Sequence, residues 1–70
     1  MSNTLTAAAE ARAALARCDM TQSDLAAATG RSRPYWQKRL AGSVSMTLDD
    51  LDMVARATGT TVAALLRVAA

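Results

Sequence analysis

The sequence contains no histidine and only one cysteine, Cys18, so it offers neither an internal disulfide nor a set of metal ligands. It also lacks a glycine-rich phosphate-binding loop and any serine or cysteine nucleophile with a base beside it. The acids Asp49, Asp50 and Asp52 lack a cation-binding loop and fit better as first-turn acids at a helix N-terminus. These absences predict a protein that is not an enzyme and that has no cofactor, metal or small-molecule substrate.

Long apolar runs and β-strand patterns are absent as well. No apolar run reaches about 18 residues, and no basic segment precedes an apolar one at the N-terminus, so neither a membrane span nor a signal peptide is expected. The β-branched residues stand singly apart from the short run Thr60, Thr61 and Val62. Alanine, which has the highest helix propensity, is the most frequent residue. We therefore expect a soluble, cytoplasmic, all-α protein with one small domain over residues 1–70.

Five helices are predicted from apolar residues at spacings of three and four and from residues that begin or end helices. Their expected ranges are 5–18, 22–28, 32–41, 48–58 and 62–68. Hydroxyl residues stand where the last four helices would be capped: Thr21, Ser32, Thr47 and Thr61. Glycines follow the second, third and fourth helices: Gly30, Gly42 and Gly59. The second and third helices, joined by a short turn, form a helix-turn-helix arrangement over about residues 21–42.

Few large side chains are available for the core, because phenylalanine and isoleucine are absent and the only aromatic residues are Tyr35 and Trp36. We expect Trp36 to be buried at the centre of the domain. On the fourth helix we expect Leu48, Leu51, Val54 and Ala55 to be buried. Cys18, late on the apolar face of the first helix, is expected to be a small buried thiol.

Acidic residues are absent between Leu25 and Leu48, although the whole chain has a net charge of only +2. Half of the eight basic residues lie in this stretch: Arg31, Arg33, Lys38 and Arg39. A patch of one charge sign, with the acids kept on either side of it, is typical of a surface that binds a polyanion.

The arrangement of these segments resembles the Cro/phage-repressor-like (Xre-type) helix-turn-helix proteins. Residues 20–30 (MTQSDLAAATG) are similar to the second helix and turn of that family, residues 32–42 to its recognition helix, and residues 47–66 to its fourth and fifth helices. The resemblance covers about residues 11–66. It implies a compact five-helix, lambda-repressor-like domain that binds double-stranded DNA sequence-specifically as a transcriptional regulator, a repressor or a Cro-like protein.

In that family the third helix lies in the major groove and its first turns contact base edges. Carried over to this sequence, the resemblance assigns base contacts to Arg33, Pro34, Gln37 and Lys38. It assigns a phosphate contact to Gln22, at the start of the second helix.

The sequence departs from the family at Pro34, where a polar side chain is usual, so one direct base contact is missing there. It also departs at two positions near the end of the third helix. Arg39 stands where many family members have an apolar residue, and Leu40 stands where many have a polar one. We therefore expect a slightly rolled third helix that buries Leu40 with Trp36 and releases Arg39 toward a phosphate.

The chemistry of the basic stretch supports these assignments to different degrees. Arg33 can pair in bidentate fashion with guanine, and Gln37 can offer a donor and an acceptor to adenine. Lys38 is better suited to a phosphate than to a base, because a point charge needs no particular geometry. Phosphate contacts are further expected from Arg31, Tyr35, Arg39 and Ser43. Plain surface charge for the arginines, and a cover over the core edge for Tyr35, remain alternatives.

Two questions stay open at the level of sequence. A helix-turn-helix fold can serve as a protein-interaction module, such as an antitoxin or adaptor, although the acid-free basic stretch favours DNA. The family usually binds inverted-repeat operators as homodimers. If this chain dimerises, the last helix with Leu66 and Val68 is the expected seam, and a monomer or a fragment of a longer regulator fits as well. No membrane partner is expected.

Overall fold

The computed structural model describes the backbone of residues 3–69 and the side chains of residues 7–66. The described residues form five helices and no strand: α1 (Asn3–Arg17), α2 (Gln22–Thr29), α3 (Arg33–Leu40), α4 (Leu48–Thr58) and α5 (Val62–Ala69). The all-α class and the order of the five helices are confirmed, and the predicted ends differ from these bounds by at most two residues. No helix in this part of the chain has the length and apolarity needed to cross a membrane.

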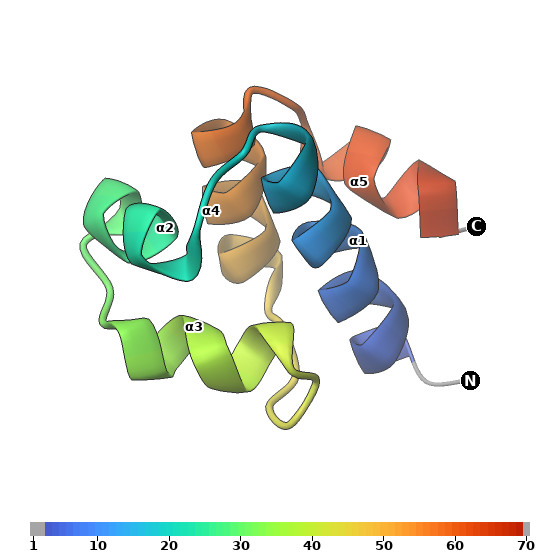
Figure 1. Ribbon diagram of the computed structural model, residues 1–70. Helices are drawn as coiled ribbons and strands as arrows, with labels where there is room; N and C mark the ends of the chain where they lie inside the picture. Colours follow the sequence, from blue (N-terminus) through green and yellow to red (C-terminus); the bar gives the residue numbers. More distant parts are fainter. Residues whose placement is uncertain (1–2, 70) are drawn as a thin grey trace.

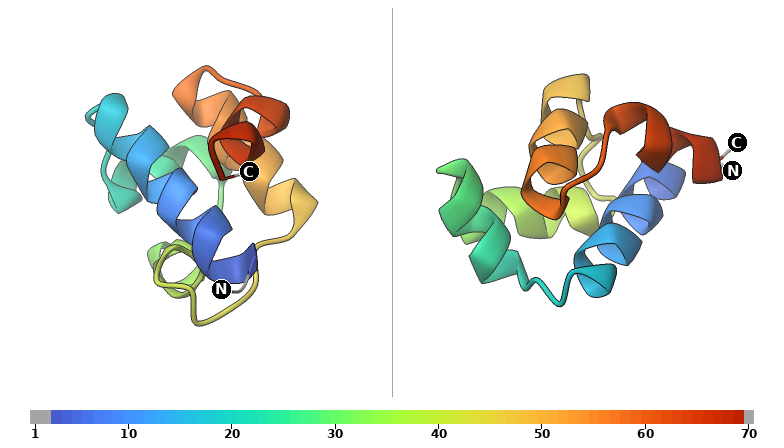
Figure 2. Two further views of the ribbon diagram at one scale, coloured as in Figure 1. Left: turned by 90° about the vertical axis from the view of Figure 1, so that its right-hand side faces the viewer. Right: turned by 90° about the horizontal axis from the view of Figure 1, so that it is seen from above.

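The helices enclose one core, with α3 along one side of the molecule (Figure 1). α1 packs against α3, α4 and α5, and α2 packs against α3 and α4. Two further views show α5 folded back beside α1 (Figure 2). The backbones of α3 and α4 do not pack closely against each other, so these two helices are joined through side chains. α3 is thus held from α1 and α2 and keeps one long side free.

The core takes side chains from all five helices. Its largest fully buried members are Trp36, Leu25, Leu40, Leu65 and Val54, and α1 contributes small residues such as Ala11. Trp36 is 0% exposed and Leu40 is 1% exposed, so the predicted burial of both is confirmed. Because a small domain has few large residues, placing its only tryptophan on α3 ties that helix to the core.

Side-chain caps define where the helices begin. Before each of the last four helices, a side-chain hydroxyl oxygen accepts a hydrogen bond from the backbone N–H of the residue three positions later. These residues are Thr21, Ser32, Thr47 and Thr61. Thr21 and Thr47 form complete capping boxes, since Asp24 and Asp50 accept their backbone N–H groups in return. All four predicted caps are therefore confirmed, and each contributes about 1 kcal/mol to helix stability.

Two predictions about burial are wrong. Leu48 is 71% exposed, because it is the first residue of α4 and stands ahead of the turn whose side chains reach the core. Cys18 is also exposed, because α1 ends at Arg17 and the chain turns away through the left-handed Asp19 at φ 54°. Its thiol donates to the carbonyl oxygen of Thr58 at 3.2 Å instead of packing in the core.

Candidate nucleic-acid interface

The turn between α2 and α3 sets the angle of the helix-turn-helix pair. α2 ends at Thr29 and is capped by Gly30, whose backbone is left-handed (φ 72°) and whose N–H donates to the carbonyl of Ala26. Ser32 then caps α3, and Pro34 lies in the first turn, where a helix needs no backbone N–H. The indole N–H of Trp36 donates to the hydroxyl of Thr29 at 2.9 Å, which fastens α3 to the end of α2. These local interactions orient α3 before any ligand is present.

The outward side of α3 carries the four residues to which the resemblance assigns base contacts. Arg33, Pro34, Gln37 and Lys38 are all exposed. They form two pairs four residues apart, so they share one face of the helix. Trp36 and Leu40 form a further pair of this spacing, and their side chains are buried. The fold thus brings these four side chains together on a free surface, and their contact with bases remains a prediction.

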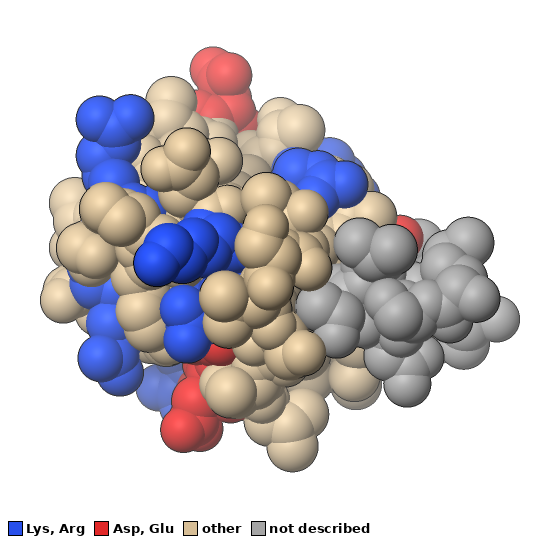
Figure 3. All heavy atoms as spheres, turned by 90° about the horizontal axis from the view of Figure 1, so that it is seen from below, with Lys and Arg blue, Asp and Glu red and all other residues tan. Residues whose placement is uncertain are grey.

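Positive charge gathers on the same side of the molecule. Seen from the side on which α3 lies, lysine and arginine side chains spread over the surface, and acidic atoms show only towards its edges (Figure 3). The exposed cations of α3 and of the turn before it are Arg31, Arg33 and Lys38. Such a surface can replace the counterions condensed on a nucleic acid.

Two polar residues assigned to phosphate stand at the ends of this helix pair. Gln22 is exposed in the first turn of α2, where backbone N–H groups without helical partners can bind an anion. Ser43 is exposed in the loop after α3, and its backbone N–H donates to the carbonyl of Lys38 at 3.0 Å. The structure does not test their phosphate roles, which also remain predictions.

Tyr35 and Arg39 lie beside this face and turn towards the protein. Both are half-buried, and both bind the carboxylate of Asp50 on α4. The Tyr35 hydroxyl donates to Oδ1, and the Arg39 Nε donates to Oδ2 at 2.9 Å. The Arg39 guanidinium also lies over the Tyr35 ring, 3.6 Å from its centroid, and Arg31 lies 5.2 Å from the same centroid. The sequence predicted phosphate contacts for Tyr35 and Arg39, and the structure shows protein partners for them.

Asp50 is 0% exposed, and its carboxylate is kept ionised by the hydrogen-bond donors around it. Burial alone raises the pKa of a carboxyl group, but hydrogen bonds from Tyr35, the Thr47 backbone and Arg39 outweigh it and hold the pKa of Asp50 below its ordinary value of 3.8. In turn, the hydrogen bond to this carboxylate and then burial raise the pKa of Tyr35 above 10.0. At neutral pH the cluster is therefore a carboxylate, a neutral phenol and a guanidinium.

Sequence reasoning missed two contacts that hold α3. Asp50 was interpreted only as a first-turn acid, and the capping-box spacing from Thr47 gives no sign of partners on another helix. The sequence assigned no partner to Arg12, yet its guanidinium donates to the carbonyl of Leu40 at the end of α3. Both contacts join residues far apart in sequence, so no local pattern could have indicated them.

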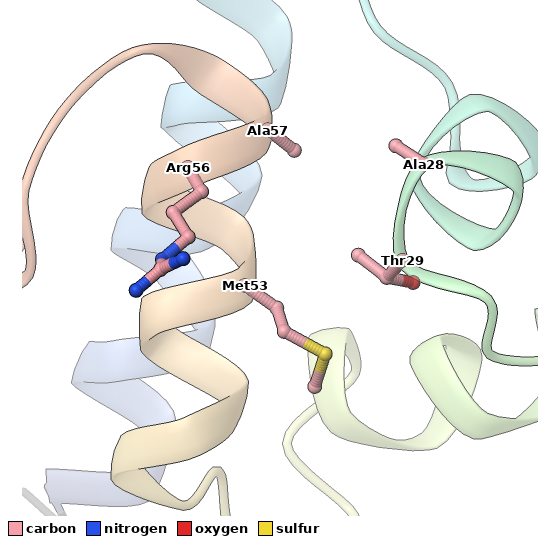
Figure 4. A pocket seen from close by; sticks show the side chains of 5 residues that line it. All are labelled: Ala28, Thr29, Met53, Arg56 and Ala57. Atoms are coloured by element: carbon pink, nitrogen blue, oxygen red, sulfur yellow. The ribbon is translucent and has the colours of Figure 1, made fainter.

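The structure also has a shallow hollow between α2 and α4. It is lined by Ala28, Thr29, Met53, Arg56 and Ala57 (Figure 4). Its one charged residue, Arg56, pairs with Asp52 on the same helix at 2.9 Å. Among the described residues no group of histidine, cysteine or acidic side chains is placed to hold a metal ion. The hollow therefore presents no set of converging reactive groups.

Comparison with known proteins agrees with the geometry. The family model of the Cro/C1-type HTH DNA-binding domain matches residues 12–70, which include all five helices except the start of α1. Comparisons with curated proteins and with solved structures gave no significant match.

Proposed function

Because the chain belongs to the Cro/C1-type helix-turn-helix DNA-binding family, we propose that it is a transcriptional regulator that inserts α3 into the major groove of double-stranded DNA. The observation that carries this proposal is the free face of α3, where four exposed side chains lie together within a basic surface. An α-helix fits the major groove, and only there does each base pair present a distinct set of donors and acceptors.

Within this face Arg33 is the strongest candidate for a base contact. It is the first residue of α3 and is exposed, and its guanidinium has the fork geometry that matches the O6 and N7 acceptors of guanine. Gln37 lies one turn later on the same face and suits adenine. Lys38 is also exposed and suits a phosphate at the edge of the groove.

Phosphate contacts on either side would fix the register of α3 along the DNA. We assign them to Gln22 with the N-terminal N–H groups of α2, to Arg31 in the turn, and to Ser43 after α3. These three residues flank α3 in the sequence and are exposed. The regulator would act as a repressor or Cro-like protein by occupying its site.

A homodimer on an inverted-repeat operator is a further part of the proposal. Leu66 on α5 is 38% exposed and offers an apolar contact to a second copy, whereas the side chain of Val68 lies outside the described residues. The arrangement of the selected DNA sites tests this point, because a dimer selects two half-sites about one helical turn apart and a monomer selects one.

The proposal is tested by selecting binding sites from a random duplex library and then measuring affinity for the selected and scrambled duplexes. We expect a shared motif that is bound at least about 10³-fold more tightly than scrambled DNA. The substitution Arg33→Ala should weaken specific binding by about 1–3 kcal/mol and relax preference at one base pair.

A matched control is Arg17→Ala, which removes the same charge from an exposed residue at the end of α1 remote from α3 (Figure 1). It should leave the base preference unchanged. If the wild-type protein shows no DNA binding even at low salt, the proposal is wrong, and a protein-interaction module on the same fold becomes the better interpretation.

A further inference from the structure

We propose that Asp50 is a positioning residue for DNA recognition, which aims the outward face of α3 and keeps the charge of Arg39 away from the phosphate backbone. This inference rests on the proposed DNA-binding function. It assigns to Tyr35 and Arg39 a role that differs from the phosphate contacts predicted from the sequence.

The first support is the position of the contact within the fold. The backbones of α3 and α4 do not pack closely, and Asp50 bridges the space between them. Its two oxygens bind side chains one helical turn apart on α3, Tyr35 at Oδ1 and Arg39 at Oδ2. Two anchors a turn apart resist rolling of α3 about its own axis. They therefore fix the direction in which Arg33 and Gln37 point.

The second support is that the cluster is complete without an external partner. The Oδ2 atom of Asp50 also accepts the backbone N–H of Thr47 at 3.0 Å. Arg39 donates from Nε to Asp50, donates from Nη1 to the Tyr35 carbonyl at 3.3 Å, and covers the Tyr35 ring. No buried polar side-chain atom in the described part of the chain lacks a hydrogen-bond partner. Arg39 thus has its Nε and Nη1 engaged within the protein, and its charge is opposed by a buried carboxylate.

The third support is electrostatic. A cation that is neutralised by a buried carboxylate in the free protein releases no counterion from DNA when the complex forms. Lys38, the neighbouring residue, is exposed and has no such partner within the described residues. The two adjacent cations should therefore contribute differently to the salt dependence of binding, although they carry the same charge.

The decisive experiment compares Arg39→Gln with Lys38→Gln in the full chain, using scrambled duplex DNA over a salt series. Lys38→Gln should reduce the magnitude of the negative slope of log K against log salt by about 0.9, whereas Arg39→Gln should leave the slope unchanged. A loss of slope in Arg39→Gln equal to that in Lys38→Gln would overturn the inference, because Arg39 would then contact a phosphate.

The reciprocal variant is Asp50→Asn, which keeps the shape of the side chain and removes its charge. In this variant we expect the slope of log K against log salt to be steeper by about 0.9, because the freed Arg39 can now pair with a phosphate. The double variant that combines Asp50→Asn with Arg39→Gln should return to the wild-type slope. The ratio of specific to scrambled affinity should fall about tenfold in Asp50→Asn, since the orientation of α3 is no longer fixed.

The control Asp49→Asn removes the same charge from the preceding, exposed residue and should leave the slope and the affinity ratio unchanged. If Asp49→Asn and Asp50→Asn give the same slope, the effect is one of net charge and the inference fails.

A measurement on Tyr35 tests the link to Asp50 separately from DNA binding, and in the wild-type protein it needs no variant to fold. Tyr35 is the only tyrosine in the chain, so the tyrosinate absorbance reports on it alone. The Asp50 link predicts a Tyr35 pKa above 10.0 in the wild-type protein and a lower value in folded Asp50→Asn. An ordinary pKa in the wild-type protein would show that the link is absent in solution and would overturn the inference. Absence of DNA binding by the wild-type protein and by Lys38→Gln alike would instead contradict the proposed function.

Discussion

Replacing Thr29 with valine tests how α2 holds the buried Trp36 of α3, because one hydrogen bond joins the two side chains. The Trp36 indole N–H donates to the Thr29 hydroxyl oxygen at 2.9 Å, and Trp36 is 0% exposed, so water cannot replace the lost acceptor. The same hydroxyl donates to the carbonyl of Leu25 at 2.8 Å. Valine keeps the branched shape of threonine and removes both interactions.

The chain contains a matched control for this change. Thr58 stands at the end of α4 as Thr29 stands at the end of α2, and its hydroxyl also donates at 2.8 Å to the carbonyl four residues earlier. Left-handed glycines follow both threonines. Thr58→Val therefore measures the loss of the shared interaction and any change in helix propensity, without an unsatisfied indole.

The difference between the two variants is the cost of leaving a buried N–H without an acceptor, about 1–3 kcal/mol. A domain of this length has a total stability of about 4–10 kcal/mol, so the difference is large enough to measure. Urea denaturation followed by circular dichroism and by the fluorescence of Trp36 gives both free energies of unfolding, with the m-value as a check on two-state behaviour. Equal losses of stability in Thr29→Val and Thr58→Val would refute the reasoning.

Three further predictions concern stability. Leu48→Ala should change the free energy of unfolding by less than about 0.5 kcal/mol, because Leu48 is exposed. Leu51→Ala should lower it by about 2–5 kcal/mol, because Leu51 is buried. Urea denaturation of both variants checks this contrast. Gly30→Ala should cost about 1–2 kcal/mol from left-handed backbone alone, because no atom lies within 4 Å of the added methyl group; a thermal melt showing no loss would contradict this. The depressed pKa of Asp50 means that its carboxylate stabilises the fold above pH 3.8 and that this contribution is lost as the pH falls through the lower folded-state value. The stability gap between wild type and Asp50→Asn should therefore narrow on acidification below 3.8, and a gap that stays constant would contradict the assignment.

The helices were predictable because their signals are local. Thr21 and Thr47 bind backbone atoms only three residues away, and Gly30 ends α2 through its own left-handed conformation. A single sequence shows such features directly. Trp36 was predictable for a different reason, since a chain with few large side chains has few ways to fill a core. The composition of α3 likewise indicated its exposed, basic face before the fold was known.

The buried cluster beside that face could not be predicted in the same way. Asp49 and Asp50 are adjacent acids in the first turn of one helix, and sequence offers no reason to bury one and expose the other. The difference arises because Tyr35 and Arg39 approach only Asp50, and this approach depends on how α3 lies across the whole domain. The prediction for Leu48 failed for a related reason: its spacing from Leu51 fits an apolar face, but the core does not extend to the N-terminal end of α4.

The central claim, that α3 contacts bases in the major groove, is tested most directly with 7-deazapurines in the selected duplex. Replacing N7 of guanine or adenine removes a major-groove acceptor and leaves base pairing and the minor-groove edge unchanged. We predict that at least one such replacement weakens wild-type binding by about 1–3 kcal/mol and that Arg33→Ala is insensitive to the replacement at the base that Arg33 contacts. Full affinity for every 7-deazapurine duplex, together with weakened binding when only minor-groove groups are changed, would contradict the account.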